Sequence, residues 1–398
     1  MSADDIIILT DPDRDRYASP RLIRWWDQAR LRAARVMVVG AGALGNEALK
    51  NLALLGAGQV WVVDFDKIEV SNLSRSVLFR ESDAGRSKAE VAAARAMALN
   101  PDVRVRALHA DVVRDVGLGV FRRMQVVLGC LDNREARWAV NRACWRLGIP
   151  WVDGGLDELN GAVKVFIPPE GACYECGLTE QDWQFMAERH SCTSRRPEDF
   201  VEGKTPTTIT SAAIIAGVQT QEALKLLHGR PLTPGSAWLY DGLKGGGARV
   251  TLNRRADCLA HDAWAPIVEV PASVGALTAR GLLQAAQAEL GLEARIYLDR
   301  EFVTRMTCSR CGRSEPGLRP YRQGQALPVT CPECGGSRYP DLTFIVQPEM
   351  DGLDQPLAAL GLPPLHILEA RNARQALYLE LTGDAAELFG TQSGGQRD

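Results

Sequence analysis

The feature that most constrains the fold is a glycine-rich loop between a short strand and a helix. Residues 35–39 are a β-branched run, and Gly40, Gly42 and Gly45 follow in a G-x-G-x-x-G pattern that opens a helical stretch. Glycines at this spacing permit a tight turn and let the backbone approach a phosphate, which the amides of the helix N-terminus then bind. The loop therefore predicts a nucleotide-binding unit, although it is equally typical of nicotinamide-dependent oxidoreductases.

Strand and helix patterns continue to alternate after this loop. Residues 59–66 and 125–132 have the pattern of strands, and residues 87–100 and 133–148 have that of helices. This alternation predicts an α/β fold with a doubly wound, mostly parallel sheet of the Rossmann type. Asp64, at the end of the second strand, is placed to accept hydrogen bonds from ribose hydroxyls.

The segment after the second strand is rich in phosphate-binding side chains. Asn72, Arg75, Arg86 and Lys88 lie close together in the sequence. A dinucleotide carries only a diphosphate, so this density of donors suits a triphosphate such as ATP better. Asp132 ends another strand at the carboxyl edge of the sheet, where a carboxylate is suited to Mg²⁺.

These motifs occur in the order found in a known superfamily. The glycine loop, the DFD of residues 64–66, the SNLSR of residues 71–75, Lys88 and the CLDN of residues 130–133 together resemble the ubiquitin-activating enzymes and their bacterial relatives. Those relatives, of the ThiF, MoeB and HesA type, include the adenylyltransferases of molybdopterin and thiazole biosynthesis. The resemblance covers residues 15–262.

The resemblance implies a role for individual residues. Asp64 would hold the ATP ribose, with Asp66 of the same motif also at the nucleotide, and Asp132 would serve magnesium binding and adenylate positioning. Asn72, Arg75 and Lys88 would contact the phosphates, and Arg75 and Lys88 would also act in catalysis.

The superfamily also uses an N-terminal arginine that reaches the ATP of a partner subunit. In this sequence Ser19 stands where that arginine is expected, and Arg21 or Arg16 is assigned to the role instead. A compact chain with one adenylation domain is accordingly expected to be a homodimer.

Eight metal-ligand residues fall into two groups, and each predicts a structural Zn²⁺ site. The spacing C-x2-C-x19-C-x2-C is that of a four-thiolate zinc ribbon. A further C-x2-C pair needs two more ligands, for which a Cys/His pair downstream is the best candidate; a zinc held by two such pairs is also common in the superfamily. The ribbon consists of Cys308, Cys311, Cys331 and Cys334, and the second set of Cys173, Cys176, Cys258 and His261.

Cys192 is the candidate nucleophile. It lies in a polar stretch, residues 177–206, that we expect to be a crossover loop, and His190, Arg195 and Arg196 near it in sequence would favour the thiolate. Its place after a C-x2-C pair is similar to that in the catalytic subunit of ubiquitin-like-protein activating enzymes. The resemblance implies a thioester on Cys192, and the alternative is an inert surface thiol.

A change in composition near residue 265 predicts a domain boundary. Residues 1–265 would form the adenylation domain with the crossover loop and one structural zinc, and residues 266–398 a smaller α+β domain with the zinc ribbon, residues 308–334, inserted. The order of elements in the second part is faintly similar to a β-grasp. In activating enzymes such a module recruits the conjugating enzyme, and the alternative is a dimerisation or stability module.

Composition excludes some classes of partner. With 46 basic and 49 acidic residues, the net charge of −3 excludes a broadly basic nucleic-acid-binding protein. No apolar run approaches the roughly 18 residues of a membrane helix, and the acidic N-terminus lacks the features of a signal peptide. We therefore expect a cytoplasmic protein without nucleic-acid or membrane partners.

The sequence as a whole favours one function over three alternatives. The favoured function is ATP-dependent adenylation of the C-terminal carboxylate of a small ubiquitin-like protein that ends in glycine. Cys192 would then capture the acyl group and pass it to a conjugating enzyme. The alternatives are a sulfur-carrier-protein adenylyltransferase without a thioester step, a nicotinamide oxidoreductase, and a zinc-ribbon scaffold without activity.

Overall fold

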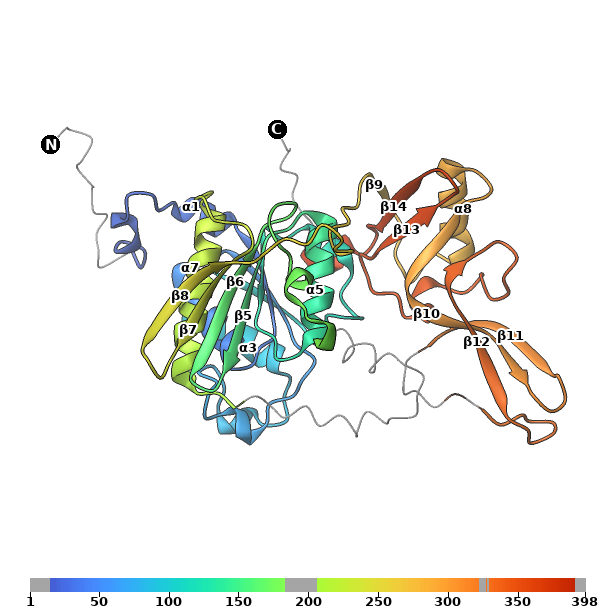
Figure 1. Cartoon of the computed structure of the whole chain (residues 1–398), viewed down its shortest axis with the longest axis horizontal. Helices are drawn as coiled ribbons and strands as arrows, with labels where there is room; N and C mark the ends of the chain where they lie inside the picture. Colours follow the sequence, from blue (N-terminus) through green and yellow to red (C-terminus); the bar gives the residue numbers. More distant parts are fainter. Residues whose placement is uncertain (1–14, 183–205, 322–326, 328, 391–398) are drawn as a thin grey trace. The chain divides into compact units, whose positions relative to one another are not determined.

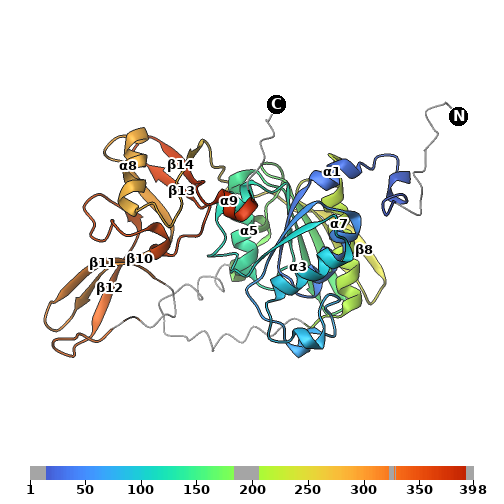
Figure 2. The same ribbon diagram turned by 180° about the vertical axis from the view of Figure 1, so that it is seen from behind.

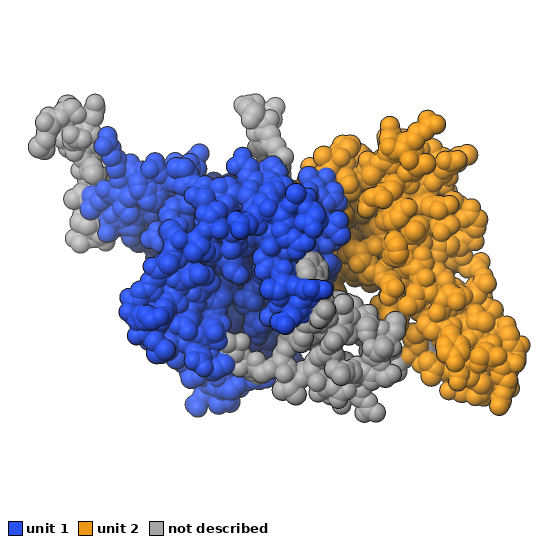
Figure 3. All heavy atoms as spheres, in the orientation of Figure 1, with its two compact units in different colours: residues 1–113, 123–182, 203–263 blue, residues 114–122, 183–202, 264–398 orange. Residues whose placement is uncertain are grey.

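The computed structural model describes residues 15–182, 206–321, 327 and 329–390. These residues form two compact units (Figure 3). Unit 1 contains residues 15–113, 123–182 and 206–263, and unit 2 contains residues 114–122 together with the described residues from 264 to 390. The second unit thus includes a short segment from the first third of the chain.

An eight-stranded sheet forms the centre of unit 1, and its five parallel strands confirm the predicted doubly wound arrangement (Figure 1). Strand order is β3-β2-β1-β4-β5-β6-β7-β8, with every pair from β3 to β5 parallel and every pair from β5 to β8 antiparallel. The strands are β1 (Arg35–Val39), β2 (Gln59–Val63), β3 (Arg104–Leu108), β4 (Val126–Gly129), β5 (Trp151–Asp157), β6 (Asn160–Phe166), β7 (Ser236–Asp241) and β8 (Gly246–Thr251).

Helices cover both faces of the parallel part. A Cβ on Gly154 of β5 would meet Leu44 and Gln219, whereas one on the next residue, Gly155, would point to Arg137. Because successive residues of a strand face opposite sides, the helices that carry Leu44 and Gln219 lie on one face and the helix that carries Arg137 on the other. Figure 2 shows α3 beside the parallel strands. The helices are α1 (Gln28–Ala33), α2 (Ala43–Leu55), α3 (Lys88–Leu99), α5 (Arg134–Leu147) and α7 (Ile209–Leu227).

Side-chain caps and glycines determine where these helices begin and end. The hydroxyl of Ser87 accepts the amide of Glu90 before α3, and the side chain of Asn133 accepts the amide of Ala136 before α5. At its carboxyl end α5 stops at Gly148 in the left-handed conformation, which glycine adopts without strain. Both caps stand at the carboxyl edge of the sheet, where they fix the first turns that carry the candidate site residues.

Unit 2 is built on a six-stranded mixed sheet with its own apolar core, which includes Leu282, Ile296, Phe302 and Leu379. Strand order is β11-β10-β13-β14-β9, and β12 pairs with β10. The similarity to a β-grasp stays a prediction. The elements are α4 (Leu118–Arg122), β9 (Ile267–Val270), α8 (Ala279–Leu290), β10 (Arg295–Cys308), β11 (Ser314–Pro320), β12 (Arg338–Val346), β13 (Ile367–Arg371), β14 (Ala376–Leu381) and α9 (Ala385–Phe389).

One strand of unit 2 extends beyond its core. The 14-residue β10 pairs with β13 through residues 295–297, and with β11 through residues 302–307 on the same side, while β12 follows its other side. Strands β10, β11 and β12 form a three-stranded arm, which Figure 1 shows projecting from the rest of the unit. The candidate zinc ribbon lies in the two turns of this arm.

Candidate functional site

The glycine loop adopts the geometry that its sequence predicts. Gly40 has a φ of +96°, and a Cβ there would lie 2.2 Å from the carbonyl oxygen of Cys130. A Cβ on Gly45 would lie 1.9 Å from the carbonyl oxygen of Gly40, so the helix can approach the strand only with glycine there. Gly42 has nothing within 4 Å of its Cβ position, which leaves the backbone open to a ligand. Gly40 thus permits the turn, Gly45 permits the helix to pack against the strand, and Gly42 leaves room for a ligand to approach the backbone.

Asp64 and Asn46 hold the loop in this shape. The carboxylate of Asp64 accepts the amide of Ala41 at 2.7 Å and the amide of Asp66 at 2.8 Å. Burial raises the pKa of Asp64, and the same two hydrogen bonds oppose this shift. The fully buried Asn46 donates its Nδ2 to the carbonyl oxygens of Ala41 at 2.7 Å and Gly42 at 3.0 Å. Sequence reasoning missed Asn46, and the available signal was an amide on an otherwise apolar helix.

Lys88 and Asp66 meet beside the loop. Lys88 is the first residue of α3, and its Nζ lies 2.7 Å from Oδ2 of Asp66, which comes from the segment after β2. The Lys88 side chain is 12% exposed and that of Asp66 is 49% exposed, so the pair lies at the surface of the site. An ammonium held in this position is suited to a phosphate group, which would compete with the Asp66 carboxylate for it.

Asn72 and Arg75 lie in the turns that follow. The Oδ1 of the buried Asn72 accepts the amide of Glu69 at 3.0 Å and closes a short 3-10 turn, residues 70–72. Nη1 of Arg75 donates to the carbonyl oxygen of Ser71 at 2.8 Å. Both side chains therefore shape their own segment, and their contact with phosphates stays a prediction.

Asp132 is exposed at the same edge of the sheet. Val39 is the register partner of both Val63 and Gly129, so the residues that follow β1, β2 and β4 emerge together. Asp132 follows β4 in this way, and the Nδ2 of Asn133 donates to its carboxylate at 3.3 Å. Its remaining oxygen lone pairs fit the preference of Mg²⁺ for a few carboxylates with phosphate oxygens.

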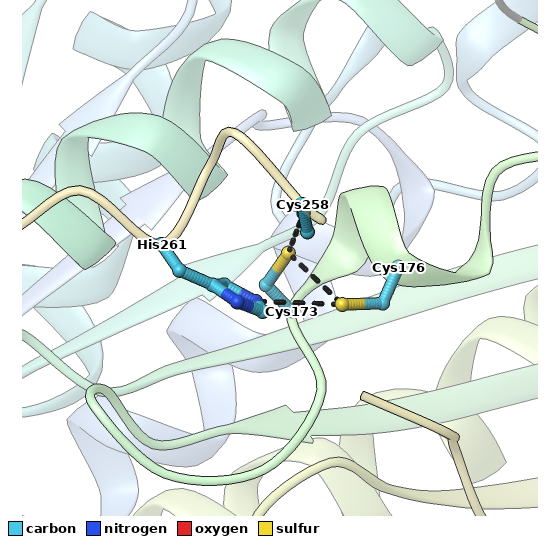
Figure 4. Close-up of side chains that lie close together, drawn as sticks. All are labelled: Cys173, Cys176, Cys258 and His261. Atoms are coloured by element: carbon cyan, nitrogen blue, oxygen red, sulfur yellow. Dashed lines mark hydrogen bonds between the residues drawn. The ribbon is translucent and has the colours of Figure 1, made fainter. Parts of the chain in front are cut away.

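The first candidate metal centre brings together Cys173, Cys176, Cys258 and His261 (Figure 4). The Sγ of Cys173 lies 3.7 Å from that of Cys176 and 3.5 Å from that of Cys258. The Sγ of Cys176 lies 3.4 Å from Nε2 of His261. Sulfurs at the corners of a zinc tetrahedron with Zn–S bonds of about 2.3 Å are about 3.8 Å apart, close to the distances seen here, so this donor set fits Zn²⁺.

The surroundings of this centre tie it to α5. Arg142 of α5 donates to both carboxylate oxygens of the buried Glu175 at 3.0 Å, and Asn141 donates to the same carboxylate at 3.2 Å. Glu175 lies between the two cysteines of the C-x2-C pair. The ring of Trp145, also on α5, lies 4.3 Å from that of His261. The centre therefore joins α5 to the end of the sheet.

The second candidate centre lies in the two turns of the arm. The Sγ atoms of Cys308 and Cys334 are 3.5 Å apart, and those of Cys311 and Cys331 are 3.7 Å apart. All four thiols are free, and all four sulfurs lie within 4.8 Å of one another. The sequence predicted the members of both centres, and the four thiolates here also fit a tetrahedral Zn²⁺.

The ThiF family model matches residues 15–260. The chain belongs to the ThiF family. The matched residues include the glycine loop, Lys88 and Asp132. They also include three of the four ligands of the first metal centre, and the fourth, His261, lies one residue beyond the match.

The relatives of this chain include an adenylyltransferase and a subunit of an activating enzyme. The chain is 37% identical over 238 residues to the sulfur carrier protein adenylyltransferase of Thermus thermophilus, which covers 58% of this chain and 83% of that protein. It is also 37% identical over 167 residues to SUMO-activating enzyme subunit 2 of Dictyostelium discoideum, which covers 42% of this chain but only 25% of that one. A crystal structure of E. coli MccB with MccA-N7isoASN has the same fold, with a TM-score of 0.52, 20% identity, and coverage of 62% of this chain and 75% of that one.

The structure does not bring Arg21 to the glycine loop of its own ThiF domain. Arg21 pairs with Asp15 at 3.0 Å, and the ring of Tyr17 close by packs on Gly56, which ends α2. The glycine loop precedes the other end of this 13-residue helix, about 20 Å away. Arg16 lies at the same far end, with its Nη1 3.5 Å from the carbonyl oxygen of Leu99.

A cavity of about 370 Å³ lies beside the nucleotide edge of the ThiF domain. Its floor is the β5–β6 hairpin, and its walls include Arg134 and Arg137 of α5 and Tyr174 of the following 3-10 turn. Arg137 donates to the Asp153 carboxylate at 3.0 Å and to the Leu131 carbonyl oxygen at 2.6 Å, one residue before Asp132. Burial raises the pKa of Tyr174 to about 12, which keeps its hydroxyl neutral. Sequence reasoning missed the cavity because it depends on the pairing of β5 with β6.

Cys192 lies outside the described residues, as does most of the predicted crossover loop, residues 177–206. Its role as a nucleophile stays a prediction. In the part of the chain that the structure describes, helices are either too short or too polar to cross a membrane.

Proposed function

We propose that this ThiF-family chain uses MgATP to adenylate the C-terminal carboxylate of a small ubiquitin-like protein. The observation that carries the proposal is the arrangement at one sheet edge. There the open Gly42 backbone, the Asp64 carboxylate and the Lys88 ammonium surround the place where a triphosphate would bind. The relatives named as adenylyltransferase and activating enzyme support the same chemistry.

The reaction balances without a further reactant. An oxygen of the substrate carboxylate attacks the α-phosphorus of ATP, the bond from that phosphorus to the bridging oxygen breaks, and pyrophosphate leaves with the electron pair. The product is a mixed anhydride with AMP, whose acyl carbon is electrophilic. Lys88 and Arg75 would offset the charge that develops on the phosphates, Asp64 would hold the ribose, and Asp132 would supply a carboxylate oxygen to Mg²⁺.

The cavity beside this edge suits an extended peptide tail. Gly155 and Ala162 are register partners in the middle of its floor, so no large side chain obstructs the passage there. Arg137 connects the cavity to Leu131 and therefore to the position of Asp132. A globular protein is too large to enter a cavity of about 370 Å³, whereas a C-terminal tail ending in glycine would pass along this floor to the nucleotide.

Cys192 would act after adenylation. Its thiolate would attack the acyl carbon, AMP would leave, and the thioester would be passed to a conjugating enzyme. The alternative, a sulfur-carrier-protein adenylyltransferase without a thioester step, is supported equally by the Thermus relative. A homodimer in which Arg21 of one chain reaches the ATP of the other is supported by the position of Arg21 far from its own glycine loop.

Pyrophosphate exchange into ATP tests the proposal directly. The assay contains the full chain, MgATP, labelled pyrophosphate and a purified ubiquitin-like protein that ends in Gly-Gly, with the same protein lacking its last glycine as the control. We expect exchange only with the intact tail, and its loss in Lys88→Met. Exchange that is absent across a panel of such proteins, together with an absence of ATP binding, would contradict the proposal.

Cys192→Ala separates the two versions of this function. If the thioester step operates, the variant retains exchange but loses a reductant-sensitive conjugate with the carrier protein. If no such conjugate forms in the unaltered chain, the sulfur-carrier version holds.

A further inference from the structure

The segment Arg114–Arg122 connects β3 to β4 of the unit 1 sheet, yet it belongs to unit 2. The segment is packed closely against other residues of unit 2. The amide of Gly119 donates to the carbonyl oxygen of Leu365 at 2.8 Å, and a Cβ on Gly117 would lie 2.1 Å from the carbonyl oxygen of Pro364. Val120 and Phe121 are each 2% exposed. We call residues 114–122 the crossover segment.

Two carboxylates of unit 2 are neutralised by the last residue of the crossover segment. Glu269 of β9 and Glu380 of β14 are register partners on adjacent parallel strands, and the Glu380 side chain is fully buried. Like charges in this arrangement destabilise a sheet. Arg122 forms an ion pair with Glu380 and another with Glu269 at 3.3 Å. Removing either partner of the buried pair would leave an uncompensated charge.

The other end of the crossover segment is also held by unit 2. Arg300 of β10 donates to the carbonyl oxygen of Arg114 at 3.2 Å and to that of Gly361 at 3.0 Å. The same guanidinium is fixed by Asp299, which lies 3.4 Å from Nε2 of His366. Burial would raise the pKa of Asp299, but His366 and Arg300 hold it well below its ordinary value, so the carboxylate stays charged.

Both continuations of the crossover segment lead to the nucleotide edge of unit 1. Upstream, His109 follows β3, and its Nδ1 lies 3.1 Å from the hydroxyl of Ser87, the residue that caps the helix of Lys88. Downstream, β4 ends at Gly129 and leads to Asp132. Upstream, four residues, 110–113, separate the anchored segment from His109. Downstream, nine residues, 123–131, which include all of β4, separate it from Asp132, which we expect to serve the ATP site.

We propose that Arg122, Glu380 and Arg300 are positioning residues for the nucleotide site. By fixing the crossover segment in unit 2, they restrict the chain on both sides of it, at His109 and at Asp132. The three residues then act on the ATP site through the chain that continues from the crossover segment. The inference about ATP rests on the proposed function, whereas the mechanical link rests on the contacts alone.

Glu380→Gln in the full chain tests the link, because it removes the charge that Arg122 neutralises and keeps the shape of the side chain. Hydrogen exchange of peptides covering residues 109–113, 114–122 and 126–133 is measured with calorimetric titration of MgATP. We expect faster exchange in all three peptides and an ATP affinity weakened by about fivefold or more. Asp354→Asn is the matched control, since it breaks the exposed Arg280–Asp354 pair elsewhere in unit 2.

Each outcome decides between the claims. Faster exchange confined to residues 114–122, with ATP affinity equal to that of the unaltered chain, overturns the proposal. If the unaltered chain does not bind ATP, the proposed function fails, and the exchange in residues 109–113 and 126–133 still decides the mechanical link. Should Glu380→Gln fail to fold, Arg300→Gln tests the other anchor with the same measurements, and unchanged exchange at both flanks would overturn the proposal.

Discussion

The two candidate metal centres have similar donor sets but different surroundings. The ligands of the unit 1 centre are supported by residues distant in sequence: Arg142 and Trp145 of α5 contact Glu175 and His261. In the arm, the supporting contacts are local. Arg310 donates its amide to the Sγ of Cys308 at 3.4 Å and its guanidinium to the carbonyl oxygen of Cys334 at 3.1 Å.

This difference indicates that the two centres contribute to stability in different ways. In unit 1 a bound metal would join the C-x2-C turn after β6 to a Cys/His pair after β8, and both pack against α5. Its binding energy would therefore be part of the folding free energy of the whole unit. In the arm a metal held by the four thiolates would connect only the two turns that carry them, so it would stabilise only the arm.

The largest expected effect follows from removing a ligand of the unit 1 centre. Cys176→Ala should lose one zinc and lower the free energy of unfolding of unit 1 by about 4 kcal/mol or more, which lowers its Tm by about 10 °C. Elemental analysis and calorimetry measure both quantities. The unaltered chain should contain two zinc ions per chain, and one or fewer would contradict the assignment of the two centres.

Removing the charge of Glu175 should lower the stability of unit 1 by less than removing a metal ligand does. Glu175→Gln removes the charge that faces Arg142 while leaving every metal ligand in place. Because the Arg142 side chain is 24% exposed and can be solvated, we expect a loss of about 2 kcal/mol with zinc content unchanged. Urea unfolding followed by tryptophan fluorescence measures it. A loss of zinc in this variant would show that Glu175 acts on the metal itself.

Local patterns were sufficient to predict several groups of residues that the structure brings together. The glycine loop, Asp64, Lys88 and both sets of metal ligands follow from short spacings whose chemistry is specific, and the structure brings each set together. The approach of Cys258 to Cys173 and of His261 to Cys176, across more than 80 residues, was predictable because a zinc site needs four ligands and few candidates were present.

What the sequence did not reveal depends on tertiary partners. The segment β11 was not expected, because its two prolines and one glycine oppose a strand, and the structure accommodates them at the edge of the sheet. The assignment of Arg114–Arg122 to unit 2 depends on its contacts with β9, β10, β14 and Leu365, which no local periodicity encodes. Asn46 likewise shapes the glycine loop through bonds that are visible only when the turn is formed.

A ligand change in the arm should leave unit 1 unaffected. Cys311→Ser removes an exposed ligand of the second centre, so zinc content should fall from two ions to one. We expect faster hydrogen exchange in residues 302–320 and a change in the stability of unit 1 below about 1 kcal/mol. Calorimetry with peptide-resolved hydrogen exchange checks this. A fall in the Tm of unit 1 comparable to that of Cys176→Ala would remove the contrast between the two centres.

The smallest effect on zinc content is expected where one metal ligand replaces another. His261→Cys converts the unit 1 centre to four thiolates, the donor set already present in the arm, and should retain zinc. The variant loses the ring contact with Trp145, 4.3 Å between centroids, and should therefore be destabilised by about 1 kcal/mol. His261→Ala is the matched control, because it loses the same ring contact and also the ligand. If both variants lose zinc equally, the imidazole fixes the geometry of the centre in a way that a thiolate cannot reproduce.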